Sequence, residues 1–278
     1  MTELPRIPLA GVIGSSIAHS KSPQLHHHWL KIYGIPGHYI PMDVSSDNLE
    51  TVLRTLPKMG FVGVNITIPH KEKVMEIADL ITDRATLIGA ANTLIFRKDG
   101  KIHADNTDGY GFIENLKAGA SQWDPRSGPA AILGAGGASR AVIASLLDAG
   151  VPEILLSNRT RVRADKIQQD FGNRVHVYDW VQAGNMVDDA ALLVNTTSLG
   201  MIGKGELRVP LDGLRPQTVV TDLVYAPLKT KMLEAAEEYG CVTVDGLGML
   251  LHQAVPAFER WFGRRPDVDH ATRAAALR

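Results

Sequence analysis

The sequence predicts an α/β protein built of two domains, and three observations support this prediction. Short apolar runs alternate with longer amphipathic ones along most of the 278 residues, as is typical of parallel sheets with crossover helices. The chain between Leu116 and Gly128 breaks this periodicity, so we expect a second domain to begin near it. After Val244 the pattern is helical only, which predicts that the C-terminal helices return to pack on the first domain.

Each element follows from its local pattern. In the first part of the chain, runs rich in apolar and β-branched residues predict strands over residues 7–13, 38–42, 63–67, 92–97 and 101–104. Amphipathic periodicity predicts helices over residues 24–33, 49–56 and 109–118. Pro23 marks the start of the first of these helices, because the first helical position tolerates proline.

The second part of the chain repeats the alternation more regularly. Strands are predicted over residues 130–133, 153–157, 175–178, 192–194, 219–223 and 242–244. Helices are predicted over residues 138–148, 161–171, 231–239 and 248–261, with a last helix from residue 266 onward. Strand–helix alternation of this kind is typical of a parallel sheet with crossover helices.

The composition excludes several classes of protein. The 29 Lys and Arg residues balance 30 Asp and Glu residues, whereas bulk binding to nucleic acid or a membrane surface requires a large basic excess. The single cysteine, Cys241, excludes a disulfide framework and a cysteine-rich metal site, and we expect no metal. No run reaches the roughly 18 apolar residues of a membrane span, and the charged start, Met1 to Arg6, argues against a signal peptide. We therefore expect a soluble, cytoplasmic protein.

A glycine-rich turn follows the strand predicted over residues 130–133. Gly134 permits a tight turn, and Gly136 and Gly137 allow the backbone to approach a pyrophosphate closely. The small residues that follow let a helix pack on the sheet and direct its N-terminal N–H groups at the phosphates. The match to the dinucleotide motif is incomplete, because Ser139 holds the last glycine position, so an ordinary tight strand–helix connection is the alternative.

The next strand indicates which dinucleotide is bound. Proteins that bind NAD place an acidic residue about 20 positions further on, to hold the ribose 2′-hydroxyl. This chain instead has Asn158, Arg159, Thr160, Arg161, Val162 and Arg163 there. Arg159 and Arg163 lie four positions apart and can converge near a helix N-terminus, where guanidinium groups bind a 2′-phosphate. The segment favours NADP over its alternatives, a solvated helix N-terminus and a small nucleic-acid patch.

Polar residues in the first half form a candidate substrate site. Ser20 and Ser22 lie two positions apart in an extended segment, where both hydroxyls can point at a polyol or a carboxylate; helix capping is the alternative for one of them. Lys71 follows the strand predicted over residues 63–67, and α/β proteins bind ligands at such carboxyl ends. A solvated lysine is the alternative there. Asp108 lies at a predicted helix start, so its alternative is N-capping.

Taken together, these segments resemble the shikimate dehydrogenase family over nearly the whole chain and in the family's order. The resemblance is carried in the first half by residues 19–23 (HSKSP), 65–71 (NITIPHK), 89–93 (GAANT) and 106–109 (NTDG). In the second half it is carried by residues 134–138 (GAGGA), 158–163 (NRTRVR), 195–201 (NTTSLGM), 222–227 (DLVYAP) and 245–253 (DGLGMLLHQ).

The resemblance implies reversible, NADPH-dependent reduction of 3-dehydroshikimate to shikimate, a step of chorismate and aromatic amino-acid biosynthesis. It implies an N-terminal α/β substrate domain of residues 1–107 plus 246–278 and a Rossmann-type NADP-binding domain of residues 108–245. In the family the active site lies in the cleft between the domains. We expect a small-molecule substrate, no nucleic acid and no membrane as partner.

The resemblance also implies a role for each matched residue. Lys71 and Asp108 correspond to the family's catalytic pair, with Lys71 as the acid/base, and Ser20 and Ser22 to the serines that hold the substrate carboxylate. The residues implied to contact the substrate hydroxyls are Thr67, Lys71, Asn92, Asp108 and Gln253, joined by Tyr225 from the nucleotide domain. The residues implied to bind the cofactor are Gly134, Ala135, Gly136, Gly137, Ala138, Asn158, Arg159, Thr160 and Arg163, with Asp83, Leu223 and Gly246 close to it.

Two other functions are alternatives on the sequence alone. A quinate/shikimate dehydrogenase shares the scaffold, but such relatives often use NAD and vary a substrate serine, whereas this chain has both serines and both arginines. A non-catalytic protein that senses NADPH or a pathway metabolite would have no need of Lys71 together with Asp108. Homodimers occur in the family that the chain resembles, and the nearly neutral composition does not predict one.

Overall fold

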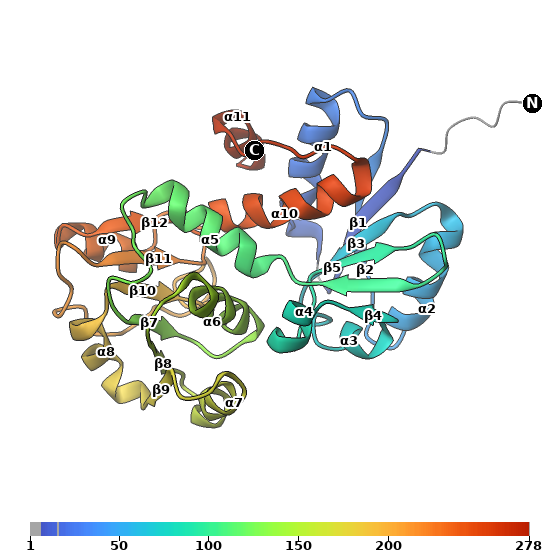
Figure 1. The fold of residues 1–278 in the computed structure, drawn as a ribbon. Helices are drawn as coiled ribbons and strands as arrows, with labels where there is room; N and C mark the ends of the chain where they lie inside the picture. The colour runs from blue at the N-terminus through green and yellow to red at the C-terminus, as the bar shows by residue number, and fades with distance from the viewer. Residues whose placement is uncertain (1–6, 16, 278) are drawn as a thin grey trace, which may run out of the picture. The chain divides into compact units, whose positions relative to one another are not determined.

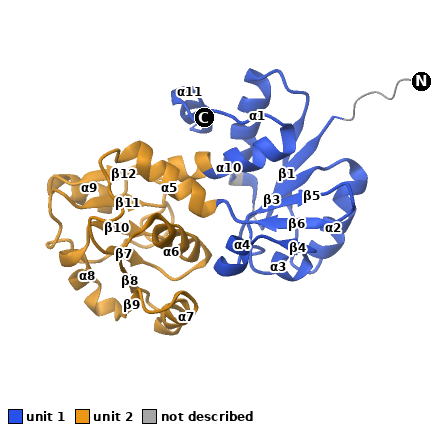
Figure 2. Ribbon diagram, in the orientation of Figure 1, with its two compact units in different colours: residues 1–107, 253–278 blue, residues 108–252 orange. Residues whose placement is uncertain are grey.

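The structure, a computed structural model, describes residues 7–15 and 17–277 (Figure 1). Two compact units are present, one formed by residues 1–107 with 253–278 and the other by residues 108–252 (Figure 2). The second boundary lies at 252/253, whereas the sequence predicts 245/246, because one uninterrupted helix, α10 (Leu247–Phe262), runs through this part of the chain. Residues 1–6, on which the expected absence of a signal peptide rests, lie outside the described residues.

A mixed sheet of six strands lies at the centre of the first unit. Its strands are β1 (Leu9–Gly14), β2 (His38–Asp43), β3 (Gly63–Ile66), β4 (Leu80–Ile81), β5 (Thr93–Phe96) and β6 (Ile102–Asp105), in the order β2-β1-β3-β5-β6-β4. β5 is antiparallel to both β3 and β6, so the parallel arrangement predicted from the alternation is wrong for this strand. Residues 97–101 alone connect β5 to β6, whereas a parallel connection needs about a dozen residues or more.

Helices pack on both faces of this sheet. Ile13 of β1 packs into a core with Leu53 and Val74, whereas its neighbour Val12 packs on the opposite face with Trp261 of α10. The helices and 3-10 segments of the first unit, besides α10, are Ile17–His19, α1 (Ser22–Ile32), α2 (Leu49–Thr55), Leu56–Met59, α3 (Val74–Ile77), α4 (Asp83–Ile88) and α11 (His270–Ala276).

The C-terminal helices return to the first unit, as the sequence predicts. The indole N–H of Trp29 in α1 donates to Oγ1 of Thr272 in α11 at 3.3 Å. The indole N–H of Trp261 in α10 donates to the carbonyl of Leu94 in β5 at 3.1 Å. These buried hydrogen bonds join the two ends of the chain within one unit.

The second unit contains a sheet of six parallel strands in the order β12-β11-β10-β7-β8-β9. The strands are β7 (Ala130–Leu133), β8 (Ile154–Ser157), β9 (Val175–Tyr178), β10 (Leu192–Asn195), β11 (Val219–Asp222) and β12 (Val242–Val244). The chain builds outward from β7 to β9 and then returns to β10 on the other side of β7. This is the Rossmann strand order, in which ligands bind at the carboxyl ends of the strands where the order reverses. The predicted Rossmann-type fold is confirmed.

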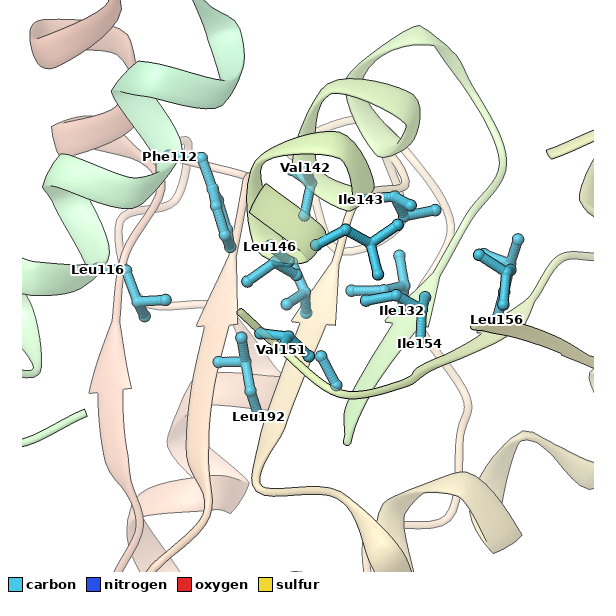
Figure 3. Packing of buried hydrophobic residues seen from close by; sticks show 14 of the residues in the cluster. Phe112, Leu116, Ile132, Val142, Ile143, Leu146, Val151, Ile154, Leu156 and Leu192 are labelled. Carbon is cyan, nitrogen blue, oxygen red and sulfur yellow. The ribbon is translucent and has the colours of Figure 1, made fainter. Parts of the chain in front are cut away.

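Helices cover both faces of this sheet as well (Figure 1). They are α5 (Asp108–Gly119), α6 (Gly137–Ala149), α7 (Arg161–Phe171), the 3-10 segment Trp180–Gln182, α8 (Ala183–Asp189) and α9 (Lys231–Glu238). Ile132 of β7 belongs to a core with Phe112 of α5 and Leu146 of α6, which Figure 3 shows, whereas Leu133 belongs to a second core with Met186 of α8. Successive strand residues face opposite sides, so burial of both faces explains why these strands are apolar throughout.

Candidate active site

Two loops of the first unit meet where its strand order reverses, at the carboxyl ends of β1 and β3. The N–H of Thr67 donates to the carbonyl of Ile13 at 2.9 Å, and the N–H of Ser15 donates to the carbonyl of Ile68 at 3.1 Å. A Cβ on Gly14 would lie 2.5 Å from the methyl carbon of Thr67, so this close approach requires glycine. The loops contain three predicted substrate residues, Ser20, Thr67 and Lys71, and a fourth, Ser22, is the first residue of α1.

The two predicted serines differ in burial and in partners. Ser22 is buried, and its backbone N–H donates to Oγ of the less buried Ser20 at 3.3 Å. Helix capping, the alternative role for one of the serines, is not seen, because Lys21 is the N-cap of α1 and no side chain there makes a capping hydrogen bond. The contact leaves the hydroxyl proton of Ser20 to donate to a ligand. The Ser22 side chain hydrogen-bonds the phenol of Tyr39, whose pKa burial raises, so the phenol stays protonated.

Asn92 is the centre of a buried hydrogen-bond network. Its Nδ2 donates to Oγ1 of Thr107 at 3.0 Å and to Oε1 of Gln253 at 3.1 Å. Its Oδ1 accepts the backbone N–H of Thr107 at 2.8 Å. The Thr107 hydroxyl also donates to the carbonyl of Gln253 at 2.9 Å. The structure thus brings together two of the predicted substrate residues, Asn92 and Gln253.

Two further residues, Asn65 and Thr107, support this network. The sequence places Asn65, like Thr67 and Lys71, near a strand end where α/β proteins bind ligands, and it assigns no role to Thr107. Asn65 donates from Nδ2 to the carbonyl of Asn92 at 3.1 Å and to Oγ1 of Thr93 at 3.2 Å, and its Oδ1 accepts the phenol of Tyr39 at 2.7 Å. Both residues have polar side chains at strand ends next to predicted site residues, and this position in the sequence could have identified them.

The predicted catalytic residues, Lys71 and Asp108, belong to different units. Lys71 is partly buried, and its carbonyl accepts the N–H of Ala91 at 2.8 Å, which ties its backbone to the segment that carries Asn92. Asp108 is buried, directly follows Thr107 and is the first residue of α5, where helix capping is its alternative role. The backbone of each residue is therefore tied to a neighbour of the Asn92 network, Lys71 through Ala91 and Asp108 through Thr107.

The glycine turn of the second unit lies between β7 and α6, at the point where the strand order reverses. Gly134 has φ +110°, a left-handed conformation that favours glycine, and a Cβ there would lie 2.6 Å from Oγ1 of Thr196. No atom lies within 4 Å of a Cβ built on Gly136 or Gly137, so the backbone there faces open space. Ser139, the departure from the motif, donates its hydroxyl to the carbonyl of Gly134 at 2.7 Å and closes the turn.

The three arginines that follow β8 fall into two groups according to their ion pairs. Arg161 pairs with Asp179 at 2.5 Å and with Asp165 at 3.5 Å. Within residues 7–15 and 17–277, Arg159 and Arg163 have no ion pair, and both are exposed. Asn158 connects this segment to the glycine turn, because its Oδ1 accepts the N–H of Ala135 at 3.2 Å and its Nδ2 donates to the carbonyl of Thr160 at 2.8 Å. Two guanidinium groups are thus left to bind an anion.

A cavity of about 340 Å³ lies against this segment. Asn158 and Arg159 line it from the end of β8, and Thr197 and Ser198 line it from the loop after β10. Its volume is within the range of small-molecule sites, about 300–1,000 Å³. The cavity lies at the carboxyl edge of the parallel sheet, where this fold binds nucleotides.

Leu223 and Gly246, predicted to lie near the cofactor, are in direct contact at the ends of β11 and β12. A Cβ on Gly246 would lie 2.3 Å from the carbonyl oxygen of Leu223. The preceding Asp222, to which sequence reasoning assigned no role, accepts Nδ2 of Asn195 at 2.9 Å and Oγ1 of Thr230 at 2.8 Å. Burial raises the pKa of Asp222 to about 6, against the effect of these hydrogen bonds.

Tyr225 and Asp83 complete the predicted set. Tyr225 follows β11 in the second unit, and its burial raises the pKa of the phenol, which therefore remains a neutral donor. Asp83 is exposed at the first position of α4 in the first unit, where a carboxylate stabilises a helix N-terminus. That structural role accounts for Asp83 without any ligand.

Comparison with known proteins decides the family. A model described as shikimate dehydrogenase substrate binding domain matches residues 12–94, one described as shikimate / quinate 5-dehydrogenase matches residues 121–208, and one described as shikimate 5′-dehydrogenase C-terminal domain matches residues 246–276. The shikimate dehydrogenase (NADP(+)) of Roseobacter denitrificans is 71% identical over 272 residues, which are 98% of either chain. The chain belongs to the shikimate dehydrogenase family. The resemblance read from the nine segments is confirmed.

Solved structures of this family have the same fold. Shikimate 5-dehydrogenase from Thermus thermophilus, in complex with NADP(H) and shikimate, has a TM-score of 0.86 at 36% identity, with 98% of this chain and 99% of that chain covered. Quinate dehydrogenase from Corynebacterium glutamicum, in complex with NAD, has a TM-score of 0.89 at 31% identity, with 98% and 99% covered. Similar folds therefore carry two different substrates and cofactors, and the fold alone does not choose between them.

Two classes of feature are missing from residues 7–15 and 17–277. No helix there combines the length and the apolar character that crossing a membrane requires. No group of three or more His, Cys, Asp and Glu side chains in the same residues is arranged to hold a metal ion.

Proposed function

We propose that this chain catalyses the reversible, NADP-dependent interconversion of 3-dehydroshikimate and shikimate, a step in the biosynthesis of chorismate and aromatic amino acids. The observation that carries the proposal is the buried network of Asn92, Thr107 and Gln253. Its amide and hydroxyl groups suit the ring hydroxyls of a small polyol acid and lie close to the point of strand reversal in the first unit. The relative that is 71% identical is named shikimate dehydrogenase (NADP(+)), which supports the same activity.

We assign the substrate groups to residues of both units. Ser20 and Ser22 hold the substrate carboxylate, and Thr67, Asn92 and Gln253 bind ring hydroxyls. Tyr225, a protonated phenol, adds a donor from the second unit. In this assignment the first unit, residues 1–107 with 253–278, is the substrate domain, and the second unit, residues 108–252, is the NADP-binding domain. The model that matches residues 12–94 is described as a substrate binding domain, which supports the first part of this assignment.

Lys71 and Asp108 carry the proton chemistry in this proposal. When bound, NADPH supplies a hydride to the carbonyl carbon of 3-dehydroshikimate. Negative charge then develops on the carbonyl oxygen, and the Lys71 ammonium donates a proton to it, so that one C–H and one O–H bond replace the carbonyl π bond. The Asp108 carboxylate orients the ammonium and the adjacent hydroxyl. In the reverse direction Lys71 accepts the hydroxyl proton.

The second unit offers the groups that NADP requires. The segment Gly134, Ala135, Gly136, Gly137 and Ala138 presents open backbone at the N-terminus of α6, which suits a pyrophosphate. Asn158, Arg159, Thr160 and Arg163 are assigned to the adenosine ribose and its 2′-phosphate, because the two arginines have no ion pair among the described residues. Leu223, Gly246 and, by family resemblance alone, Asp83 are assigned to the neighbourhood of the cofactor.

We further propose a cytoplasmic location and a homodimer. Cys241, the single cysteine, is buried as a free thiol, which accords with a reducing compartment. Cell fractionation would test the location. Size-exclusion chromatography with light scattering would test the dimer, and a mass equal to one chain would exclude it.

The absorbance of the reduced nicotinamide tests the catalytic proposal. Purified protein should turn over shikimate with NADP⁺ and should have a much lower kcat/KM with quinate or with NAD⁺. A preference for quinate with NAD⁺ would support the alternative that the Corynebacterium glutamicum structure represents. Binding of NADPH with no turnover of either acid would support a non-catalytic binding protein.

A further inference from the structure

We infer that Trp180 and Arg208 bind the adenosine end of the cofactor, Trp180 against the adenine ring and Arg208 on the 2′-phosphate. The inference rests on the proposed use of NADP and adds two residues that lie outside the nine short motifs that carry the family resemblance. Both residues line the cavity of about 340 Å³ that Asn158 and Arg159 also line. The NADP-binding surface of this chain therefore extends beyond the segment after β8.

Trp180 gives the cavity a flat, apolar wall. It is the one aromatic side chain among the described residues that line the cavity, and it lies in the 3-10 segment after β9. Its partly buried ring packs against the core that contains Met186 of α8. The preceding residue, Asp179, is held by its ion pair with Arg161. A ring supported in this way has little freedom to lose when a planar base stacks on it.

Arg208 is available to an anion because its present partner holds it weakly. Its side chain is 86% exposed, and its Nε lies 3.6 Å from Oε2 of Glu206. Glu206 is bound more closely by Lys231, at 2.8 Å. An exposed ion pair of this length contributes little to stability, so Arg208 can give up Glu206 for a phosphate. A guanidinium forms two parallel hydrogen bonds to a phosphate.

The negative charge of Glu206 should oppose the binding of a 2′-phosphate in this cavity. Glu206 also lines the cavity, and the hydrogen bond from Lys231 lowers its pKa, so it is anionic at neutral pH. An anion beside the phosphate position opposes a 2′-phosphate and competes with it for Arg208. Removal of this charge should therefore strengthen binding of the phosphate, whereas removal of Arg208 should weaken it.

Two adenosine fragments can distinguish the binding of the 2′-phosphate by Arg208 from the binding of adenine by Trp180. Adenosine 2′,5′-bisphosphate carries the 2′-phosphate, and 5′-AMP lacks it; neither needs the nicotinamide or the substrate. Isothermal titration of the full chain should give a Kd for the bisphosphate about tenfold higher in Arg208→Ala, the loss of one charged hydrogen-bonded contact, with the Kd for 5′-AMP within about twofold. Glu206→Gln should lower the Kd for the bisphosphate about twofold or threefold and leave 5′-AMP unchanged.

A matched control for Arg208 lies in the same unit. Arg126 is an exposed arginine that precedes β7, at the amino edge of the sheet and away from the cavity. Arg126→Ala should leave both dissociation constants unchanged. An equal loss in Arg126→Ala and Arg208→Ala would indicate a general effect of net charge and would overturn the role of Arg208.

Trp180 should affect both fragments equally, because both contain adenine. Trp180→Leu should raise both dissociation constants about fivefold to tenfold, in the range of one stacking contact, while Trp180→Phe keeps a ring and should stay within about threefold of the original protein. Both fragments should quench the indole emission, and Trp180→Phe should abolish most of that quenching. Thermal unfolding of Trp180→Phe checks that the fold is intact.

The outcomes separate this inference from the proposed function. If the original protein binds the bisphosphate and Arg208→Ala and Trp180→Leu bind both fragments equally well, the inference is wrong and the NADP assignment stands. If the original protein binds neither fragment, the NADP assignment fails and the inference fails with it. Loss of the bisphosphate alone in Arg208→Ala, and of both fragments in Trp180→Leu, supports the inference whether or not shikimate is turned over.

Discussion

Nδ2 of Asn92 donates to Oε1 of Gln253 at 3.1 Å, although 161 positions of the chain separate the two residues. The bond joins the segment before β5 to α10, and Thr107 reinforces it by bonding to both partners. Because Oδ1 of Asn92 accepts the N–H of Thr107, the amide group faces Gln253 with its donor side. A buried network in which each amide has one orientation holds its groups ready for a ligand and is costly to interrupt.

Thr107→Val should lower both stability and substrate affinity. Valine has nearly the same shape, but it leaves Nδ2 of Asn92 without one acceptor and removes the side-chain donor to the carbonyl of Gln253. The free energy of unfolding should fall by about 1–3 kcal/mol, as expected for unsatisfied buried polar groups. The KM for shikimate should rise about tenfold if misplacement of the amides costs about 1.4 kcal/mol in binding. Urea denaturation and initial-rate kinetics measure the two effects.

Thr86→Val is the matched control for this prediction. Thr86 lies exposed in α4, and its side chain makes no hydrogen bond within the described residues. The same change there should alter the free energy of unfolding by less than about 0.5 kcal/mol. Equal effects at positions 86 and 107 would show that the network does not contribute.

Most of the fold could be predicted from the sequence, because the pattern of each strand and helix is local. The short elements α3, β4, α4 and α8 were not predicted, and in α8 tertiary packing overrides local preference. α8 contains Gly184 and Asn185, which favour helix weakly, and it forms because Met186 and Val187 pack into a core. The antiparallel direction of β5 follows from the length of the connection to β6, which an alternation pattern does not express.

The site could be predicted only as far as its motifs extend. Family resemblance named Asn92 and Gln253, but the hydrogen bond between them depends on the return of α10 to the first unit. The cavity that Trp180 and Arg208 line combines the ends of β8 and β9 with the loop after β10. Three segments distant in sequence must converge to form it, so no single stretch of residues carries its signal.

Lys71→Ala should separate catalysis from cofactor binding. Without the ammonium, no group on Lys71 can protonate the developing alkoxide, so kcat should fall by about 100-fold or more. The dissociation constant for NADPH, measured by fluorescence titration, should stay nearly the same. Lys73 is the control, because its Nζ donates to the carbonyl of Ser46 on the surface, and Lys73→Ala should keep kcat within about twofold. A Lys71→Ala protein with nearly unchanged kcat would remove this residue from the mechanism.

Gly136→Ala should impair cofactor binding without harming the fold. Gly136 has φ −100° and ψ −173°, which alanine adopts freely, and a Cβ there meets no protein atom within 4 Å. The free energy of unfolding should therefore change by less than about 1 kcal/mol. The Kd for NADPH should rise at least about tenfold, because the new methyl group occupies the space assigned to the pyrophosphate. Unchanged NADPH affinity would place the pyrophosphate elsewhere.

Gly246→Ala, unlike Gly136→Ala, should destabilise the fold. Its Cβ would lie 2.3 Å from the carbonyl oxygen of Leu223, in the protein interior, so the backbone has to move. This variant should lose about 3 kcal/mol or more in free energy of unfolding. Thermal unfolding compares the two variants directly, and similar stabilities would contradict the distinction between open space at Gly136 and close packing at Gly246.

Asp222 should make the protein less stable as the pH rises. Burial raises its pKa to about 6, whereas an aspartate in the unfolded chain titrates near 3.9. Between these values the folded protein holds more protons than the unfolded protein, so the contribution of this group to the free energy of unfolding falls as the pH rises from about 4 to 6. The loss amounts to about 2–3 kcal/mol for a shift of about two units.

Asp222→Asn isolates this contribution. An asparagine can keep Oδ1 as acceptor for Asn195 and Val224, and its Nδ2 can donate to Oγ1 of Thr230. All other titrating groups are common to the two proteins, so their effects cancel in the difference between the free energies of unfolding. That difference, variant minus original, should increase by about 2 kcal/mol between about pH 4 and pH 7, as measured by urea denaturation. Parallel curves would mean that the Asp222 carboxyl titrates alike in the folded and unfolded chains, and that its burial is offset in full by its three donors.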